Sequence, residues 1–160
     1  MYKNRIKSML DIIAKKELDG AIITSRDNTM YFSSFSGTDS IIIFTREKAY
    51  FATDFRYIET ASSLSSYGYE VVLIEEGLKS ITTLLSKLFV EKNIRIGYEN
   101  TVSYGYFDSL KKGLNECVYA DITEDLLTIR SIKDKTEISL MAKAASIADM
   151  AFSHILKFVK

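Results

Sequence analysis

The single histidine and the single cysteine limit the chemistry that this 160-residue chain could carry out. His154 stands near the end of the chain between apolar residues, and Cys117 opens the apolar stretch 117–120. Nucleophilic and acid–base mechanisms need a base beside the reacting group, and the sequence has no such partner, no HExxH or GxSxG motif and no glycine-rich phosphate loop. We therefore expect no catalytic residue here, and we interpret His154 as a core or interface histidine and Cys117 as a buried apolar residue.

The acidic residues are numerous enough to suggest a metal site or an acid–base pair. The candidates are Asp54, Glu59, Glu75, Glu76, Asp121, Glu124 and Asp125. Scattered acids are more typical of a solvated surface, and the last three fall at the start of a helix near Thr123, where they would cap it and complement its dipole. The sequence therefore predicts no metal ion or other cofactor within this chain.

Two polar segments have richer local chemistry. In segment 53–57, Asp54 is placed to cap a following helix, and Arg56 offers a planar fork for a carboxylate, so structural pairing is the favoured interpretation. In loop 35–40, small polar residues follow an aromatic patch, which suits either a plain turn or a contact with a neighbouring molecule's site.

The spacing of apolar residues predicts the elements that position these segments. We expect helices over 4–16, 55–64, 78–88 and 104–112, a further helix near 123, and strands at 21–23, 41–44, 49–52, 71–74, 94–98 and 117–120. Runs 41–44 and 49–52 lie close enough to form a hairpin, and crossover helices between the later strands make them parallel. The predicted fold class is α/β, a three-layer mixed sheet with helices on both faces, plus a long C-terminal helix.

That C-terminal helix is predicted to begin at a capping box formed by Asp134 and Glu137. Two neighbouring apolar stripes run along it, one from Ile138 to Val159 and one from Leu140 to Phe158. It could lie in a groove of its own domain, but residues 1–130 offer an obvious partner for one stripe only. We therefore expect residues from about 134 onward to protrude, to pack against another copy or to be poorly ordered.

Composition excludes several classes of protein. The 21 basic and 21 acidic residues cancel, which disfavours nucleic-acid binding, and no apolar run approaches the ~20 residues that span a membrane. The charged start of the sequence is unlike a signal peptide, and one cysteine allows no internal disulfide, so we expect a cytoplasmic protein. Without proline and with only 7 glycines, the chain shows no flexible linker.

Several motifs resemble the N-terminal domain shared by creatinase, prolidase and the Xaa-Pro aminopeptidases. The first runs from the helix with Asn4 and Arg5 through strand 19–24 to the aromatic and glycine residues of segment 28–38. The second, segment 53–57 with Ala61, is similar to the family's TDxRYxxxA motif. The third, segment 129–138, is similar to the R-x-I-K-x-x-x-E-I junction. One departure is Ser33, Ser34 and Phe35, where the family usually has Thr-Gly-Phe.

The resemblance implies a ribonuclease-H-like domain at 1–130, followed at 131–160 by the junction and first helix of a pita-bread peptidase domain that lies downstream. That domain would hold two divalent metal ions, Mn, Co or Zn, through two aspartates, a histidine and two glutamates, all absent here. The expected function is therefore that of the non-catalytic N-terminal domain of a metal-dependent Xaa-Pro peptidase of the aminopeptidase P or prolidase type. This chain alone is expected to hydrolyse nothing.

Family dimers place this domain over the partner subunit's catalytic cleft, so the resemblance implies a homodimer, contact with the chain's own catalytic domain and a peptide substrate. Candidates for the substrate entrance or the dimer contact are Asn28, Tyr31, Phe35, Gly37, Thr38, Asp39, Ser40, Asp54, Arg56 and Tyr57. Two alternatives stay open: a metal-free binding protein of this architecture, as in a histone-chaperone subunit, and a creatine amidinohydrolase. Neutral charge and short loops favour the peptidase.

Overall fold

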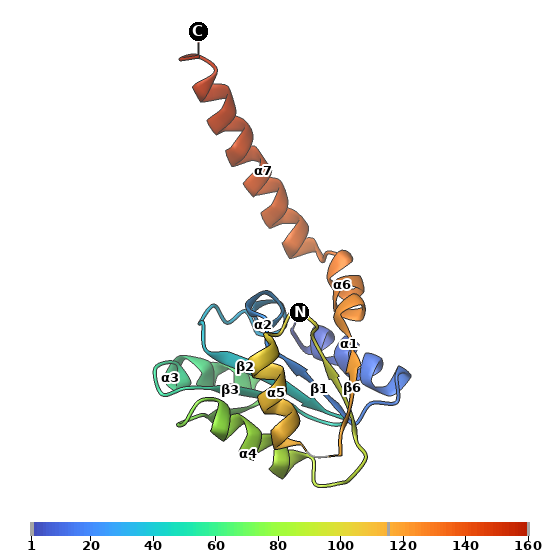
Figure 1. Ribbon diagram of the computed structural model, residues 1–160. Coiled ribbons are helices and arrows are strands. Elements are labelled where there is room, and N and C mark those ends of the chain that lie inside the picture. The colour runs from blue at the N-terminus through green and yellow to red at the C-terminus, as the bar shows by residue number, and fades with distance from the viewer. Residues whose placement is uncertain (1, 115, 160) are drawn as a thin grey trace. The chain divides into compact units, whose positions relative to one another are not determined.

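A mixed six-stranded β-sheet is the central element of the computed structural model, which describes residues 2–114 and 116–159 (Figure 1). Its strands are β1 (Gly20–Ile23), β2 (Ser40–Thr45), β3 (Ala49–Thr53), β4 (Tyr69–Leu73), β5 (Arg95–Tyr98) and β6 (Val118–Asp121). Their order in the sheet is β4-β3-β2-β1-β5-β6. Because β2 pairs antiparallel with both β1 and β3 while the remaining pairs are parallel, the other five strands share one direction.

Strands β2 and β3 form the hairpin that the sequence predicts, with Ile42 opposite Phe51. The turn contains no glycine. Instead, the Thr45 hydroxyl accepts hydrogen bonds from the backbone N–H groups of Glu47 at 3.4 Å and Lys48 at 3.1 Å, and the Thr45 N–H donates to the Lys48 carbonyl at 2.9 Å. A threonine side chain therefore stabilises this turn through local backbone hydrogen bonds.

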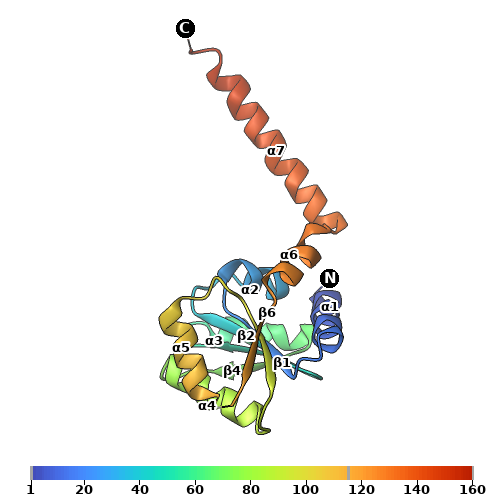
Figure 2. The ribbon, with the colours of Figure 1, turned by 45° about the vertical axis from the view of Figure 1, so that its right-hand side comes forward.

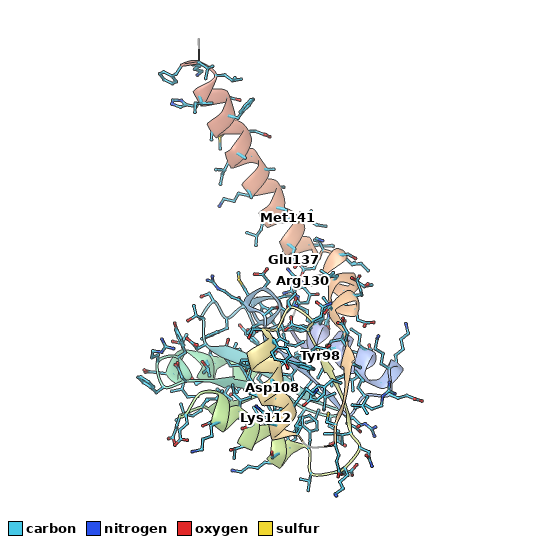
Figure 3. All side chains as sticks on the ribbon, in the orientation of Figure 1. Tyr98, Asp108, Lys112, Arg130, Glu137 and Met141 are labelled. Atoms are coloured by element: carbon cyan, nitrogen blue, oxygen red, sulfur yellow. The ribbon has the colours of Figure 1, made fainter. Side chains whose placement is uncertain are left out.

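Helices α4 (Leu78–Leu88) and α5 (Tyr104–Gly113) lie side by side on one face of the sheet (Figures 1 and 2). Asp108 and Lys112 form an ion pair of 2.7 Å on α5, and Figure 3 labels both. The buried core on this face consists of Ile22, Ile41, Ile43, Ala52, Ile74, Ile81, Leu85, Phe89, Ile94, Ile96, Leu110 and Leu114. These apolar side chains fix both helices against the strands.

Helices α1 (Tyr2–Lys15), α2 (Arg26–Ser33) and α3 (Ile58–Ala61), with the 3₁₀ segment Ser62–Tyr67, cover the opposite face. Phe32 of α2 packs edge-to-face on Phe44, with ring centroids 5.4 Å apart. The Tyr69 hydroxyl donates to the Phe32 carbonyl at 3.1 Å. Side chains of a strand alternate between faces, so Ile41 and Ile43 meet α4 and α5 while Phe44 meets α2. The predicted three-layer α/β fold is confirmed.

The chain divides into two compact units between Leu127 and Thr128, within α6 (Thr123–Ser131). In the second unit, α7 (Lys135–Ile155) begins at the predicted capping box: the Asp134 carboxylate accepts from the Thr136 and Glu137 N–H groups, both at 2.9 Å. None of the described residues of α7 is buried. Among the described helices, none is both long and apolar enough to cross a membrane. The predicted boundary near residue 130 between two domains stays a prediction.

Two side-chain interpretations need correction. Cys117 is half-buried because it adjoins the edge strand β6, although partial burial still raises the pKa of its thiol. His154 is exposed and is not a core residue, and its ring lies 5.1 Å from the Phe158 ring. A role for His154 at an interface stays a prediction.

A polar pocket at the carboxyl edge of the sheet

A pocket of about 500 Å³ opens where the parallel strands end. We call it the carboxyl-edge pocket. Its lining residues are Thr24, Ser25, Thr38, Asp39, Ser40, Ile41, Asp54, Phe55, Ile74, Glu75, Gly77, Ile81, Thr101, Val102, Ser103 and Tyr106. Hydroxyl groups and carboxylates therefore surround an apolar floor, and the whole pocket lies within the first compact unit.

The topology of the sheet explains the position of this pocket. Strands β1 and β5 are parallel neighbours, and the helices that follow them, α2 and α5, lie on opposite faces. Strands β3 and β4 repeat this arrangement with α3 and α4. In α/β sheets, ligands bind at such points outside the carboxyl ends of the strands, where the connections diverge.

Asp39, Asp54 and Arg56 form an ion-pair cluster at the pocket rim. The Arg56 guanidinium donates to Asp39 at 2.6 Å and, through Nε, to Asp54 at 2.9 Å. These hydrogen bonds lower the pKa of the Asp54 carboxyl below its usual value, and the two carboxylates raise the pKa of Arg56. Asp54 does not cap α3, whose N-cap is Tyr57, because its carboxylate instead accepts from the Arg56 backbone N–H at 2.9 Å.

The loop 37–40 carries three of the lining residues, Thr38, Asp39 and Ser40, and rests on a buried support. The fully buried Thr53 donates its hydroxyl proton to the Asp39 carbonyl at 2.7 Å. A side chain at Gly37 would overlap the Phe35 ring, which packs edge-to-face on Phe51 at 5.0 Å. The loop is therefore held by the end of β3 and by packed aromatic rings.

The remaining predicted residues lie away from the pocket and support α2 and the loop. Tyr57 packs its ring 5.5 Å from the Phe35 ring. The centroid of the Tyr31 ring lies 4.1 Å from the Arg5 guanidinium, and the backbone carbonyl of Tyr31 accepts a hydrogen bond from that guanidinium. The Asn28 amide donates to the buried Glu99. The structure thus brings Thr38, Asp39, Ser40, Asp54 and Arg56 together, and places Asn28 and Tyr31 elsewhere.

Glu99 supports one side of the pocket, and the sequence analysis did not identify it. It lies just beyond β5, is 2% exposed, and accepts five hydrogen bonds: from the N–H and hydroxyl groups of Thr24 and of Ser25, and from the Asn28 amide. This carboxylate fixes the β1–α2 turn, and with it the two hydroxyl groups on one side of the pocket. The only sequence signal was an acid directly after a strand, which is also common on surfaces.

The side chains that the structure describes do not offer the donor set of a metal centre. Among residues 2–114 and 116–159, no group of three or more His, Cys, Asp or Glu side chains is placed to hold an ion. At the pocket rim, Asp39 and Asp54 are already bound to Arg56. No reaction step through a metal can therefore be assigned to these residues.

Comparison with known proteins places the chain in a family. The sequence model of the creatinase/prolidase N-terminal domain matches residues 5–132. The chain is 32% identical over 157 residues, 98% of its length, to the uncharacterized peptidase YqhT of Bacillus subtilis, and 26% identical over 153 residues to an Xaa-Pro dipeptidase of Pyrococcus horikoshii. Among solved structures, the Xaa-Pro dipeptidase from Bacillus anthracis aligns with all of the chain at 29% identity and a TM-score of 0.86.

The chain therefore belongs to the creatinase/prolidase N-terminal domain family. It spans less than half of these relatives: 44% of the Bacillus subtilis protein, 41% of the Pyrococcus horikoshii protein and 44% of the Bacillus anthracis structure. The resemblance seen in the sequence motifs is confirmed for the family and for the fold.

Proposed function

We propose that this chain is the non-catalytic N-terminal domain of a metal-dependent Xaa-Pro peptidase of the aminopeptidase P or prolidase type. One observation carries the proposal: the chain aligns with less than half of the length of a protein named as a peptidase and of a protein named as an Xaa-Pro dipeptidase. Residues 131–160 would form the junction and first helix of the catalytic domain, and the rest of that domain, with two divalent ions (Mn, Co or Zn), would follow residue 160. The chain's own part is to bind that domain and to act in the cytoplasm as half of a homodimer.

Within that dimer, loop 37–40 narrows the entrance to the partner subunit's catalytic cleft. Its support favours this role, because a loop that limits substrate size must keep its position when a peptide arrives. Thr53 holds the Asp39 carbonyl, and Arg56 holds the Asp39 carboxylate, while the Asp39 side chain remains 57% exposed. A rigid polar loop excludes bulky chains and water from a cleft.

Exchange of this loop in the full-length polypeptide tests the proposal. The variant replaces Thr38, Asp39 and Ser40 with glycines, and the control replaces the exposed Glu47, in the hairpin turn at the other end of β2, with serine. We expect the loop variant to change the ratio of kcat/KM for tripeptide and dipeptide substrates and to weaken the dimer in analytical ultracentrifugation. Unchanged values for both quantities would reject the entrance role.

Two further assays of the full-length polypeptide, of creatine hydrolysis and of peptide binding, distinguish the alternative functions. Hydrolysis of creatine by the full-length polypeptide without added metal would indicate a creatine amidinohydrolase. Peptide binding without any turnover would indicate a metal-free binding protein of the same architecture. Either result would reject the peptidase proposal while leaving the family membership unchanged.

A further inference from the structure

The carboxyl-edge pocket has an unusual combination of position and charge. It joins both points at which neighbouring parallel strands send their helices to opposite faces, β1 with β5 and β3 with β4. Both α4 and α5 begin at its wall, where Gly77 and Ser103 are the N-cap residues. A volume of about 500 Å³ lies within the range of pockets that hold small molecules.

The charged lining residues are all acidic. Asp39, Asp54 and Glu75 line the pocket, and none of the lysines and arginines that the structure describes does. Arg56 binds Asp39 and Asp54 from the rim and offsets one of these charges, whereas Glu75 makes no ion pair among the described residues. The surplus of negative charge favours a ligand that carries an ammonium group.

The opposite charge is provided by a helix. The N-cap residue of α4 is Gly77, which has no side chain to accept a hydrogen bond, and the Ser80 hydroxyl in the first turn accepts only from the Glu76 N–H, at 3.0 Å. The Lys79 N–H donates to the Glu76 carbonyl at 3.3 Å, while the other N–H groups of the first turn and the helix dipole at such an end favour a carboxylate. At the start of α2, Glu99 accepts hydrogen bonds from the N–H groups of Thr24 and Ser25, and the hydroxyl of the N-cap residue Ser25 accepts from the Asn28 N–H. A ligand carboxylate is therefore directed to α4 and not to α2.

The floor of the pocket is apolar. Ile41 and Ile81 are buried, and the half-buried Tyr106 ring lies with them in the lining. Six hydroxyl groups surround this floor, on Thr24, Ser25, Thr38, Ser40, Thr101 and Ser103. A ligand with an apolar side chain or a proline ring would cover this floor with its apolar part, while the polar ends of the ligand meet the rim.

We propose that the carboxyl-edge pocket binds a small zwitterion of amino-acid or dipeptide size. The ammonium group lies toward Glu75 and Asp54, the carboxylate toward the first turn of α4, and the apolar part over Ile41 and Ile81. The choice of an Xaa-Pro dipeptide as this zwitterion rests on the proposed function. Because the pocket is built only from this chain, its occupancy requires no catalytic domain.

Titration of the 160-residue chain with Ala-Pro tests the proposal by nuclear magnetic resonance. We expect the backbone amide signals of residues 79–81 and 101–106 to shift in a saturable way. N-acetyl-Ala-Pro, which lacks the ammonium group, and Ala-Pro amide, which lacks the carboxylate, should bind more weakly than Ala-Pro. No shift at the solubility limit of Ala-Pro, or equal binding of all three compounds, would overturn the proposal.

A matched pair of variants tests the acidic rim. Glu75→Gln removes the unpaired pocket carboxylate, and Glu76→Gln makes the same change at a residue that does not line the pocket and pairs with Lys79 at 2.7 Å. We expect the first to weaken Ala-Pro binding about threefold, as for a partly exposed ion pair, and the second to leave it unchanged. Equal effects would overturn the proposal. None of these readouts depends on peptidase activity, so an inactive full-length polypeptide would reject the proposed function alone.

Discussion

Ser34 occupies a backbone conformation that normally belongs to glycine. It ends α2 with φ 64° and ψ 5°, and its N–H donates to the Met30 carbonyl at 2.7 Å. This is the position at which the family usually has glycine, so the departure noted in the sequence leaves the left-handed turn intact. A residue with a Cβ atom is less stable than glycine in this conformation.

Replacement of Ser34 with glycine is therefore expected to stabilise the chain. The expected gain is about 0.5–1 kcal/mol in the free energy of unfolding, measured by urea denaturation. Ser34→Ala is the matched control, because it removes the hydroxyl group without relieving the backbone, and it should give no gain. A loss of stability in Ser34→Gly would show that the serine side chain contributes more than the backbone costs.

Tyr106 and Tyr119 differ in one hydrogen bond. Among the residues that the structure describes, the buried Tyr106 hydroxyl has no hydrogen-bond partner, whereas the Tyr119 hydroxyl donates to the Leu110 carbonyl at 3.1 Å. We expect Tyr106→Phe to stabilise the chain by about 1 kcal/mol and Tyr119→Phe to destabilise it by a similar amount. Thermal unfolding of the two variants measures the difference, and the same sign for both would contradict it.

Tyr106 also affects the stability of the chain at alkaline pH. Burial raises the pKa of Tyr106 from 10.0 to about 12. Between these values the unfolded chain loses the phenol proton while the folded chain retains it, so stability falls as pH rises. Tyr106→Phe should therefore reduce the slope of the free energy of unfolding between pH 10 and 12. An unchanged slope would show that the hydroxyl is hydrated in the folded state.

At the scale of elements, Glu99 joins β5 to the β1–α2 turn. Its donors Thr24, Ser25 and Asn28 lie more than seventy residues earlier in the chain. Glu99→Gln replaces one acceptor oxygen with a donor that faces other donors, and we expect a loss of about 2–4 kcal/mol in urea denaturation. Glu70→Gln, in an exposed pair with Lys48 at 2.6 Å, is the control and should cost less than about 1 kcal/mol.

The helices and strands could be predicted from the sequence because the spacing of apolar residues reflects which side chains of an element are buried. The hairpin, the parallel strands, α5 and the capping box of α7 were predicted close to their observed bounds. The helix predicted from residue 55 is instead a short α3 and a 3₁₀ segment, since Asp54 binds Arg56 rather than the helix end. Glu99 and the carboxyl-edge pocket were missed because both depend on contacts between distant segments, which local patterns do not encode.

At the scale of the whole molecule, the two compact units differ in what they bury. The first unit encloses the apolar core on both faces of the sheet. In the second unit, α7 leaves large apolar side chains exposed, among them Ile138, Met141 and Phe152. An apolar face of this length is characteristic of a helix that packs on a partner.

The most direct test of the central claim compares the 160-residue chain with the full-length polypeptide that contains it. Both are assayed for hydrolysis of Xaa-Pro dipeptides, first with added manganese, cobalt or zinc in turn and then with a chelator. We expect activity only in the full-length polypeptide, and only with the metal. Metal-dependent cleavage by the 160-residue chain, or no cleavage by the full-length polypeptide with any of the three metals, would contradict the account.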